Sequence, residues 1–250
     1  MALKRTSEGY YNDSGKKLPR VTNVIGKYDA EGLIHWSSIE CGNHIFGVLE
    51  PLAKKKPHMI KYILEDTVAN GKGKWKLVRN SGGDRGTELH SLIEMRLKGK
   101  KIPEDYLKDD DEFKKILTNI DKWREEWGFE PETFKTDLGP LAESIEVMLE
   151  SKEHGYAGTC DAIGTTKDGR TILFDIKTGK TTKDTIGMQL AAYAHAWVEQ
   201  GGKEPDLCFV LHVLPSGNLK EKIFLDKEQC HSRFEAFLGL LRCYKEFEES

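Results

Sequence analysis

The chain has 250 residues, of which 38% are apolar and 32% charged, and its formal net charge at pH 7 is −3. This length allows a sizeable core, and a single domain over residues 1–250 is the default expectation. No apolar run approaches the roughly 18 residues of a membrane span, and Met1–Arg5 lack the start of a signal peptide. The five cysteines are scattered, so we expect reduced thiols, a cytoplasmic protein and no membrane partner.

Charge is distributed unevenly along the chain. Residues 51–101 hold 13 Lys and Arg against 5 Asp and Glu, whereas residues 102–161 hold 7 against 17. Such asymmetry predicts one basic and one acidic surface, although a Lys-rich segment can equally be a solvated loop. The triplet Lys54, Lys55 and Lys56 is a candidate contact for an anionic partner such as nucleic acid.

The first half of the chain carries helical signals. Apolar spacing predicts helices over 57–70, about 84–97 and 111–127, with a glycine-rich basic loop over 71–83. We therefore expect a helical, basic N-terminal extension over about 1–83, followed by a core over 84–250.

The second half alternates strands and helices. Period-two alternation and apolar runs predict strands over 144–149, 156–163, 170–176, 207–214 and 219–225. Helices are expected over about 184–199, with Asp184 as a possible N-cap, and over 227–247. This order predicts an α/β sandwich around a mixed sheet.

Asp175 and Lys177 form the strongest local signal. They are two residues apart at the end of an expected strand, so both side chains point to one face while Ile176 points to the other. An ion pair that closes the strand is the ordinary alternative. A hairpin around residues 165–169 would bring Asp161 beside Asp175, and two such carboxylates repel unless a proton or cation lies between them. Mg²⁺ prefers oxygen-rich surroundings of this kind, although Asp161 could also be a simple turn residue.

Four motifs in this order resemble those of the PD-(D/E)XK nuclease superfamily, in its RecB-like branch. The similar segments are Arg85–His90 (Gly-x-x-x-His), Gly155–Asp161 (Gly-x-x-Asp), Phe174–Lys177 (Asp/Glu-x-Lys) and Gln189–Tyr193 (Gln-x-x-x-Tyr). Leu18–Thr22 resembles a Pro-Ser-Val-Thr segment, with Arg20 in place of serine. The resemblance spans roughly residues 18–225 and implies a restriction-endonuclease-like core of αβββαβ order.

The resemblance also implies roles for individual residues. Asp161, Asp175, His90 and the Ile176 carbonyl would bind Mg²⁺ or Mn²⁺, and Lys177 would activate the attacking water. Gln189 and Tyr193, one helical turn apart, would position DNA or the lysine. Glu146 lies where relatives often carry an acid, with Glu143 and Glu150 as competitors. From the residues alone, His90 could instead pair with Glu94, and Gln189 and Tyr193 could be ordinary surface and core residues.

The implied activity is that of a metal-dependent exonuclease acting on DNA ends or single strands in a bacterial or phage-infected cell, alongside recombination or replication proteins. A structure-specific endonuclease and a non-catalytic DNA-binding protein are the alternatives. ATP is not expected, because Phe174 stands where a P-loop preceding Gly179–Thr181 needs glycine. An iron–sulfur cluster is not expected, because Cys208, Cys230 and Cys243 lack close pairing.

Overall fold

The computed structural model describes residues 3–28, 86–102, 107, 110–135, 141–178 and 185–248. The chain divides into two compact units, one of Met1–Lys27 with Leu89–Ser250 and one of Tyr28–Glu88. The first unit contains nearly all of the described residues. The helix expected over 57–70, the loop over 71–83 and the Lys54–Lys56 triplet lie outside the described residues. Among the described helices, none is long and apolar enough to span a membrane.

The N-terminal segment begins as a small antiparallel sheet. It consists of β1 (Lys4–Thr6), β2 (Gly9–Tyr11) and β3 (Lys17–Leu18), and α1 (Val21–Tyr28) follows. The turn between β2 and β3 is held by the Asn12 side chain, which accepts hydrogen bonds from the Ser14 and Lys16 amides, and Gly15 supplies a φ of 76°. The expectation of a helical N-terminal part is therefore wrong over residues 4–18, where turn-forming residues favour hairpins.

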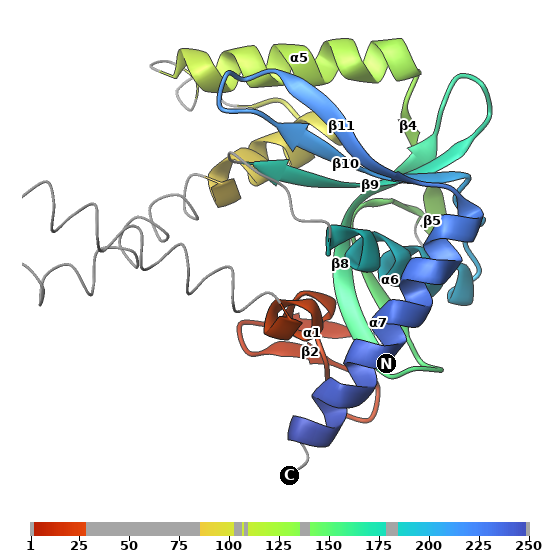
Figure 1. Cartoon of the computed structure of the whole chain (residues 1–250). Coiled ribbons are helices and arrows are strands. Elements are labelled where there is room, and N and C mark those ends of the chain that lie inside the picture. The colour runs from red at the N-terminus through yellow and green to blue at the C-terminus, as the bar shows by residue number, and fades with distance from the viewer. Residues whose placement is uncertain are drawn as a thin grey trace, which may run out of the picture. The chain divides into compact units, whose positions relative to one another are not determined.

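The central sheet of the first unit is curled and mixed, with neighbours in the order β11-β10-β9-β8-β4 and with β7 also paired to β8 (Figure 1). Only β9 and β10 are parallel among these pairs. The strands are β4 (Glu130–Pro131), β7 (Ile145–Ser151), β8 (Tyr156–Thr165), β9 (Thr171–Thr178), β10 (Leu207–Val213) and β11 (Leu219–Leu225). A separate pair joins β5 (Thr133–Lys135) to β6 (Leu141–Glu143).

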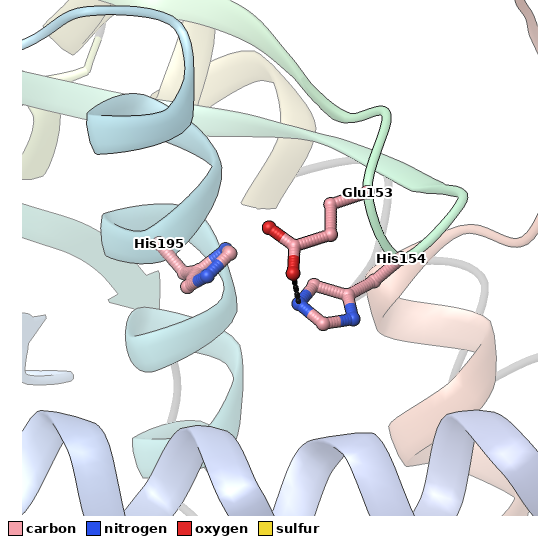
Figure 2. A group of neighbouring side chains, drawn as sticks. All are labelled: Glu153, His154 and His195. Carbon is pink, nitrogen blue, oxygen red and sulfur yellow. Dashed lines mark ion pairs between the residues drawn. The ribbon is translucent and has the colours of Figure 1, made fainter.

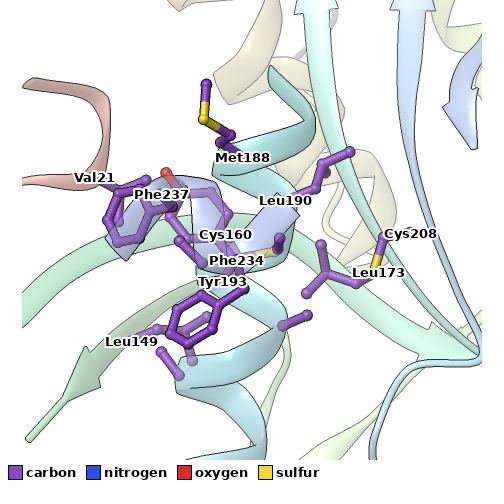
Figure 3. Packing of buried hydrophobic residues seen from close by; sticks show 14 of the residues in the cluster. Val21, Leu149, Cys160, Leu173, Met188, Leu190, Tyr193, Cys208, Phe234 and Phe237 are labelled. Atoms are coloured by element: carbon purple, nitrogen blue, oxygen red, sulfur yellow. The ribbon is translucent and has the colours of Figure 1, made fainter. Parts of the chain in front are cut away.

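Helices cover both faces of this sheet. Helical residues 86–97, called here the His90 helix, and α5 (Asp111–Trp127) share one core with the sheet. Helices α1, α6 (Ile186–Glu199) and α7 (Lys227–Glu248) share the other, part of which Figure 3 shows. The expected α/β arrangement with a mixed sheet between helices is therefore confirmed.

Local capping signals explain helix α5, whereas close packing on the sheet explains helix α6. The Asp110 side chain caps α5 by accepting a hydrogen bond from the Phe113 amide, and Gly128 ends the helix in the left-handed conformation. Helix α6 buries 11 of its 14 residues, several of them alanines, which lets it pack closely on the sheet. Its N-cap is Thr185 and not Asp184 as expected, and Thr185 makes no side-chain capping bond within the described residues.

Candidate active site

The β8–β9 hairpin brings Asp161 and Asp175 together. The antiparallel register of these two strands ends with Ala162 opposite Phe174, and one further residue on each strand leads to the two aspartates. Beyond this point a side chain takes over the pairing of the two strands. The Asp161 Oδ2 accepts a hydrogen bond from the Ile176 amide at 2.6 Å. The two carboxylates therefore lie on neighbouring strands, as the hairpin predicted.

Strand β9 presents Asp175 and Lys177 on one face and buries Ile176 in the core on the other. The Lys177 Nζ lies 2.5 Å from the Asp175 Oδ2, and Asp175 is only 2% exposed. Burial acts to lower the pKa of Lys177, but the charges of Asp175 and Asp161 outweigh it and raise that pKa above its ordinary value. Lys177 is therefore a firmly charged ammonium, 30% exposed, beside two carboxylates.

Helix α6 supplies the second contact to Asp175. The Gln189 Nε2 donates to the Asp175 Oδ1 at 2.7 Å and lies 3.2 Å from the Tyr193 hydroxyl oxygen. Both α6 side chains are buried. The Tyr193 ring lies directly on Gly158, where an added Cβ would be 2.5 Å from the ring. Gln189 and Tyr193 thus face the carboxylate rather than solvent, and Gly158 provides the space that this arrangement needs.

His90 approaches the same place from the His90 helix. Its Nδ1 is 3.7 Å from the Asp161 Oδ2, which is too long for a hydrogen bond. Burial is the main cause that lowers the pKa of His90, so the neutral imidazole is favoured, which is the form that can bind a metal. The alternative partner Glu94 is instead bonded to the Lys98 Nζ at 2.6 Å.

Glu146 joins this group through an unusual backbone conformation. Its φ of 54° is rare for a residue other than glycine. Normal alternation would bury Ile145 and Val147 on one face, yet Ile145 belongs to the α5-side core and Val147 to the α6-side core. Strand β7 therefore changes face at Glu146.

This change of face accompanies a possible ligand set. Glu146, His90 and Asp161 each offer a donor atom within 4.8 Å of the others. Of the competing acids, Glu150 is buried and has Lys152, Asp13 and Glu199 as its charged neighbours, whereas the side chain of Glu143 lies outside the described part. Glu146 is thus the acid of β7 that reaches the site.

The charge of this site is not balanced within the protein. Burial, and then the negative charge of Asp175, raises the pKa of Asp161 well above its ordinary value, although Lys177 and the Ile176 amide oppose the shift. Burial and Glu94 likewise raise the pKa of Glu146. Buried carboxylates in this state favour a proton or a cation between them. Two carboxylates with one neutral imidazole therefore fit a divalent cation.

Asp175 stands apart from the three-residue group. Both of its oxygens already face nitrogen donors, Gln189 on one side and Lys177 on the other. The Ile176 backbone lies between the two parts of the site, because its amide contacts Asp161 and it also forms a backbone hydrogen bond with His90. The fold thus brings the predicted residues together. Glu146, which had only a weak sequence signal, lies in one group with His90 and Asp161.

Residues of the N-terminal sheet also reach this region, which the sequence did not predict. The hydroxyl groups of Tyr10 and Thr159 are 2.6 Å apart, and an Arg5 guanidinium nitrogen donates to the Thr159 hydroxyl at 3.4 Å. The Arg20 guanidinium lies 5.3 Å from the centre of the Tyr10 ring. Only Arg20 had a local signal, in the Leu18–Thr22 segment, whereas nothing near Arg5 or Tyr10 in the sequence indicates a contact with β8.

A basic groove of about 630 Å³ adjoins this N-terminal sheet. Its lining carries five cationic side chains and one acidic one, namely Lys16, Lys17, Arg20, Lys152, Lys245 and Glu8. Its lining also includes Gly155, beside the start of β8, six residues before Asp161. At about 3.3 Å per residue this separation is roughly 20 Å. The groove is thus a concentration of positive charge in a chain of net charge −3.

Comparisons with known proteins give only distant similarity. No protein-family model matches the sequence, and no curated protein does. A solved structure from Eubacterium rectale, described as a "Putative exonuclease", aligns at 11% identity and a TM-score of 0.33, over 63% of this chain and 66% of that one. The structure of SSO0001 aligns at 14% identity and a TM-score of 0.24, over 62% and 87%. The chain spans just under two thirds of the first structure's length.

Proposed function

We propose that this protein is a metal-dependent deoxyribonuclease with a restriction-endonuclease-like core, and that it acts as an exonuclease on DNA ends or single strands. The observation that carries the proposal is the convergence of His90, Glu146 and Asp161 beside the Asp175–Lys177 pair. These groups come from three separate elements, the His90 helix, β7 and the β8–β9 hairpin. If Asp175 and Lys177 formed only a structural ion pair at the end of β9, there would be no reason for His90, Glu146 and Asp161 to gather beside them.

Mg²⁺ or Mn²⁺ is the cofactor that this donor set supports. His90, Glu146 and Asp161 would hold it, because carboxylate oxygens suit hard cations and a neutral imidazole suits Mn²⁺. When bound, such an ion neutralises phosphate charge and lowers the pKa of water. Asp175 would be a further ligand, because a carboxylate has more acceptor sites than the contacts with Gln189 and Lys177 use. Asp175 also holds the Lys177 ammonium in place and connects β9 to α6 through Gln189.

Lys177 is the residue that we propose to act on the reacting phosphate. Its ammonium remains charged despite burial, and a fixed cation stabilises negative charge that develops in the transition state. Gln189 orients the Asp175 carboxylate through its hydrogen bond, and the Tyr193 ring packs against Gly158 beside Gln189. These two are positioning residues, since both are buried behind Asp175.

The basic groove indicates where the rest of a DNA strand could lie. Phosphate contacts by Lys and Arg supply most of the sequence-independent affinity for nucleic acid. The groove lies within roughly 20 Å of Asp161 along β8, a span of a few nucleotides. The cations of this groove could bind an anionic substrate even if the Lys54–Lys56 triplet made no contact with it. The role of the triplet in DNA binding stays a prediction.

An assay on linear and covalently closed circular DNA of the same sequence tests the proposal. With Mg²⁺ we expect end-labelled linear DNA to be degraded and closed circles to remain intact, and EDTA should stop the reaction. The Asp161→Asn variant is the matched control for a contaminating nuclease. Nicked or linearised circles would favour the endonuclease alternative. Binding without cleavage of either substrate, in Mg²⁺ and in Mn²⁺, would identify a non-catalytic DNA-binding protein.

A further inference from the structure

A second group of donor side chains lies away from the candidate active site. Glu153 and His154 belong to the turn between β7 and β8, and His195 lies on α6, 41 residues after His154 (Figure 2). Each offers a ligand atom within 4.8 Å of the other two. The Glu153 carboxylate oxygen is 3.8 Å from the His154 Nε2, and the two imidazole ring centres are 5.1 Å apart.

The turn that carries two of these residues is fixed in place. The Glu199 Oε1 of α6 accepts hydrogen bonds from the Lys152 amide at 2.7 Å and from the Glu153 amide at 2.9 Å. The Lys245 Nζ of α7 donates to the His154 carbonyl oxygen at 2.7 Å. The backbone under Glu153 and His154 is therefore anchored to two helices, and little ordering would be needed to bind a ligand there.

His195 is held as firmly as the turn. Its ring stacks on Phe234 at 3.9 Å between centres and 11° between planes. Its Nδ1 is buried and has no hydrogen-bond partner among the described residues, and the Glu199 Oε2 lies 3.9 Å away, beyond hydrogen-bond length. A fixed imidazole with an unsatisfied nitrogen is typical of a site prepared for another partner. Burial, and then the proximity of His154, lowers the pKa of His195, so the neutral ring is favoured.

We propose that Glu153, His154 and His195 form a second metal site that takes a borderline transition-metal ion, with Zn²⁺ as the representative. Two imidazoles and one carboxylate make a donor set that suits Zn²⁺ better than Mg²⁺. Bonds of about 2.0–2.1 Å in a tetrahedral site place ligand atoms roughly 3.4 Å apart. The Glu153 side chain, 69% exposed, can make most of the adjustment from the present separations. Water would supply the fourth ligand.

A metal in this position would connect the β7–β8 turn to α6. The same helix carries Gln189, which contacts Asp175 and lies six residues before His195, about 9 Å along the helix axis. Zn²⁺ would therefore act as a structural ion that stabilises the packing of α6 on the sheet. Because it binds the folded protein, it should raise the melting temperature in a concentration-dependent way.

The test uses untagged full-length protein, stripped with EDTA and dialysed. Zn²⁺ binding is measured by titration calorimetry and by the shift in melting temperature, in the parent and in Glu153→Gln and His195→Phe. The phenylalanine keeps an aromatic ring against Phe234 while it removes both ring nitrogens. His231→Phe is the matched control, because His231 is an exposed histidine near His195 that lies outside the group. Asp161→Asn removes a donor of the other site.

We expect one Zn²⁺ to bind to the parent, to His231→Phe and to Asp161→Asn through this site. His195→Phe should weaken that event by at least about 100-fold, since even outer-shell changes cost 10–100-fold. Glu153→Gln should weaken it less. Co²⁺ substitution should give the absorption of a tetrahedral complex in the parent and in Asp161→Asn, and lose it in His195→Phe. Equal Zn²⁺ affinity and an unchanged Co²⁺ spectrum in folded His195→Phe would overturn the proposal.

Discussion

The two donor groups in the described part of the chain differ in depth, composition and charge balance. His90, Glu146 and Asp161 are rich in carboxylates and stand beside the charged Lys177. Glu153, His154 and His195 are rich in imidazole and lie at a turn, with Glu153 largely exposed. Hard cations prefer the first kind of donor set and borderline ions the second.

The neighbouring carboxylates show what this difference means. The pKa of Asp161 is raised by burial and by Asp175, so its negative charge costs stability in the absence of a cation. The pKa of Glu199, beside His195, is lowered despite its burial, because Ser151 and the amides of the turn donate hydrogen bonds to it. A carboxylate whose negative charge is not compensated by its neighbours is typical of a catalytic site. A carboxylate whose charge is compensated by hydrogen bonds is typical of a part of the protein that serves stability.

The largest effect expected from this comparison is on the rate of cleavage. Lys177→Ala removes a cation that should stabilise transition-state charge, and the loss of one such group costs about 10²–10³ in rate. DNA binding in Ca²⁺ should remain near that of the parent, because the carboxylates stay in place. Lys177→Arg should not restore the rate, since a planar guanidinium cannot replace a compact ammonium. Single-turnover cleavage in Mg²⁺ and DNA affinity in Ca²⁺ measure the two effects.

A Lys177→Ala variant that cleaves within a few-fold of the parent would remove the main distinction between the two donor groups. Lys177 would then be an ion-pair partner for Asp175 and nothing more. The matched substitution outside both donor groups and outside the basic groove is Lys203→Ala, which changes an exposed lysine and should leave the single-turnover rate within a few-fold of the parent.

A smaller effect is expected from the residue that holds Asp175. Gln189→Leu keeps the volume in α6 but removes the 2.7 Å hydrogen bond to Asp175. Loss of a group that orients a site carboxylate typically lowers metal affinity or activity by 10–100-fold. We expect a decrease in this range in Mn²⁺-dependent cleavage, with the melting temperature within a few degrees of the parent. Retained activity would mean that Lys177 alone is enough to fix Asp175.

The sequence predicted those parts of the fold whose signals are local. Helix α5 begins and ends at the expected residues because Asp110 and Gly128 are strong caps. The β8–β9 hairpin follows from a turn between two apolar runs, and the relation of Asp161 to Asp175 follows from it. These features depend on residues that are close in the chain, where spacing alone determines which face a side chain occupies.

The sequence did not predict features that depend on distant contacts. The φ of 54° at Glu146 is held by packing on both faces of β7 and has no glycine to indicate it. Arg5 and Tyr10 reach Thr159 across about 150 residues. His154 and His195 lie on separate elements, so their spacing shows no metal motif. Tertiary packing decides each of these positions, and one sequence does not show it.

The charge imbalance at Asp161 leads to a prediction about stability without metal. Asp161→Asn keeps an oxygen that can accept from the Ile176 amide but removes the negative charge beside Asp175. In EDTA at pH 7 the variant should be more stable than the parent by about 1 kcal/mol, a usual gain when a functional charge is removed. A carboxyl with a raised folded pKa binds extra protons in the native state, so the parent should recover this difference as the pH falls. Urea unfolding at pH 7 and pH 5 tests this.

An Asp161→Asn variant that is less stable than the parent in EDTA would contradict the view of this site as unbalanced. The comparison with Mn²⁺ present provides the control. The parent should then gain stability and the variant should gain little, because the variant lacks a ligand.

The smallest effect is expected at the turn, with the opposite dependence on pH. The pKa of Glu199 is lowered below its ordinary 4.5, against the effect of burial, by hydrogen bonds from Ser151 and the amides of Glu153 and Lys152. A depressed folded pKa means that ionised Glu199 stabilises the fold above about pH 4.5 and that this contribution is lost as the pH falls through the folded pKa. Glu199→Gln should therefore destabilise the metal-free protein by about 0.5 kcal/mol at pH 7, because glutamine keeps an acceptor oxygen and loses only the charge.

The difference between Glu199→Gln and the parent should shrink below pH 4.5, where the parent carboxylate becomes protonated. Urea unfolding of both proteins in EDTA at several pH values between about 7 and about 3 measures this change. Asp161→Asn in the same series should move in the other direction, since its parent carboxylate has a raised pKa. If both variants shifted stability with the same sign at pH 7, the two donor groups would not differ in charge balance, and the assignment of one to chemistry and the other to stability would lose its electrostatic basis.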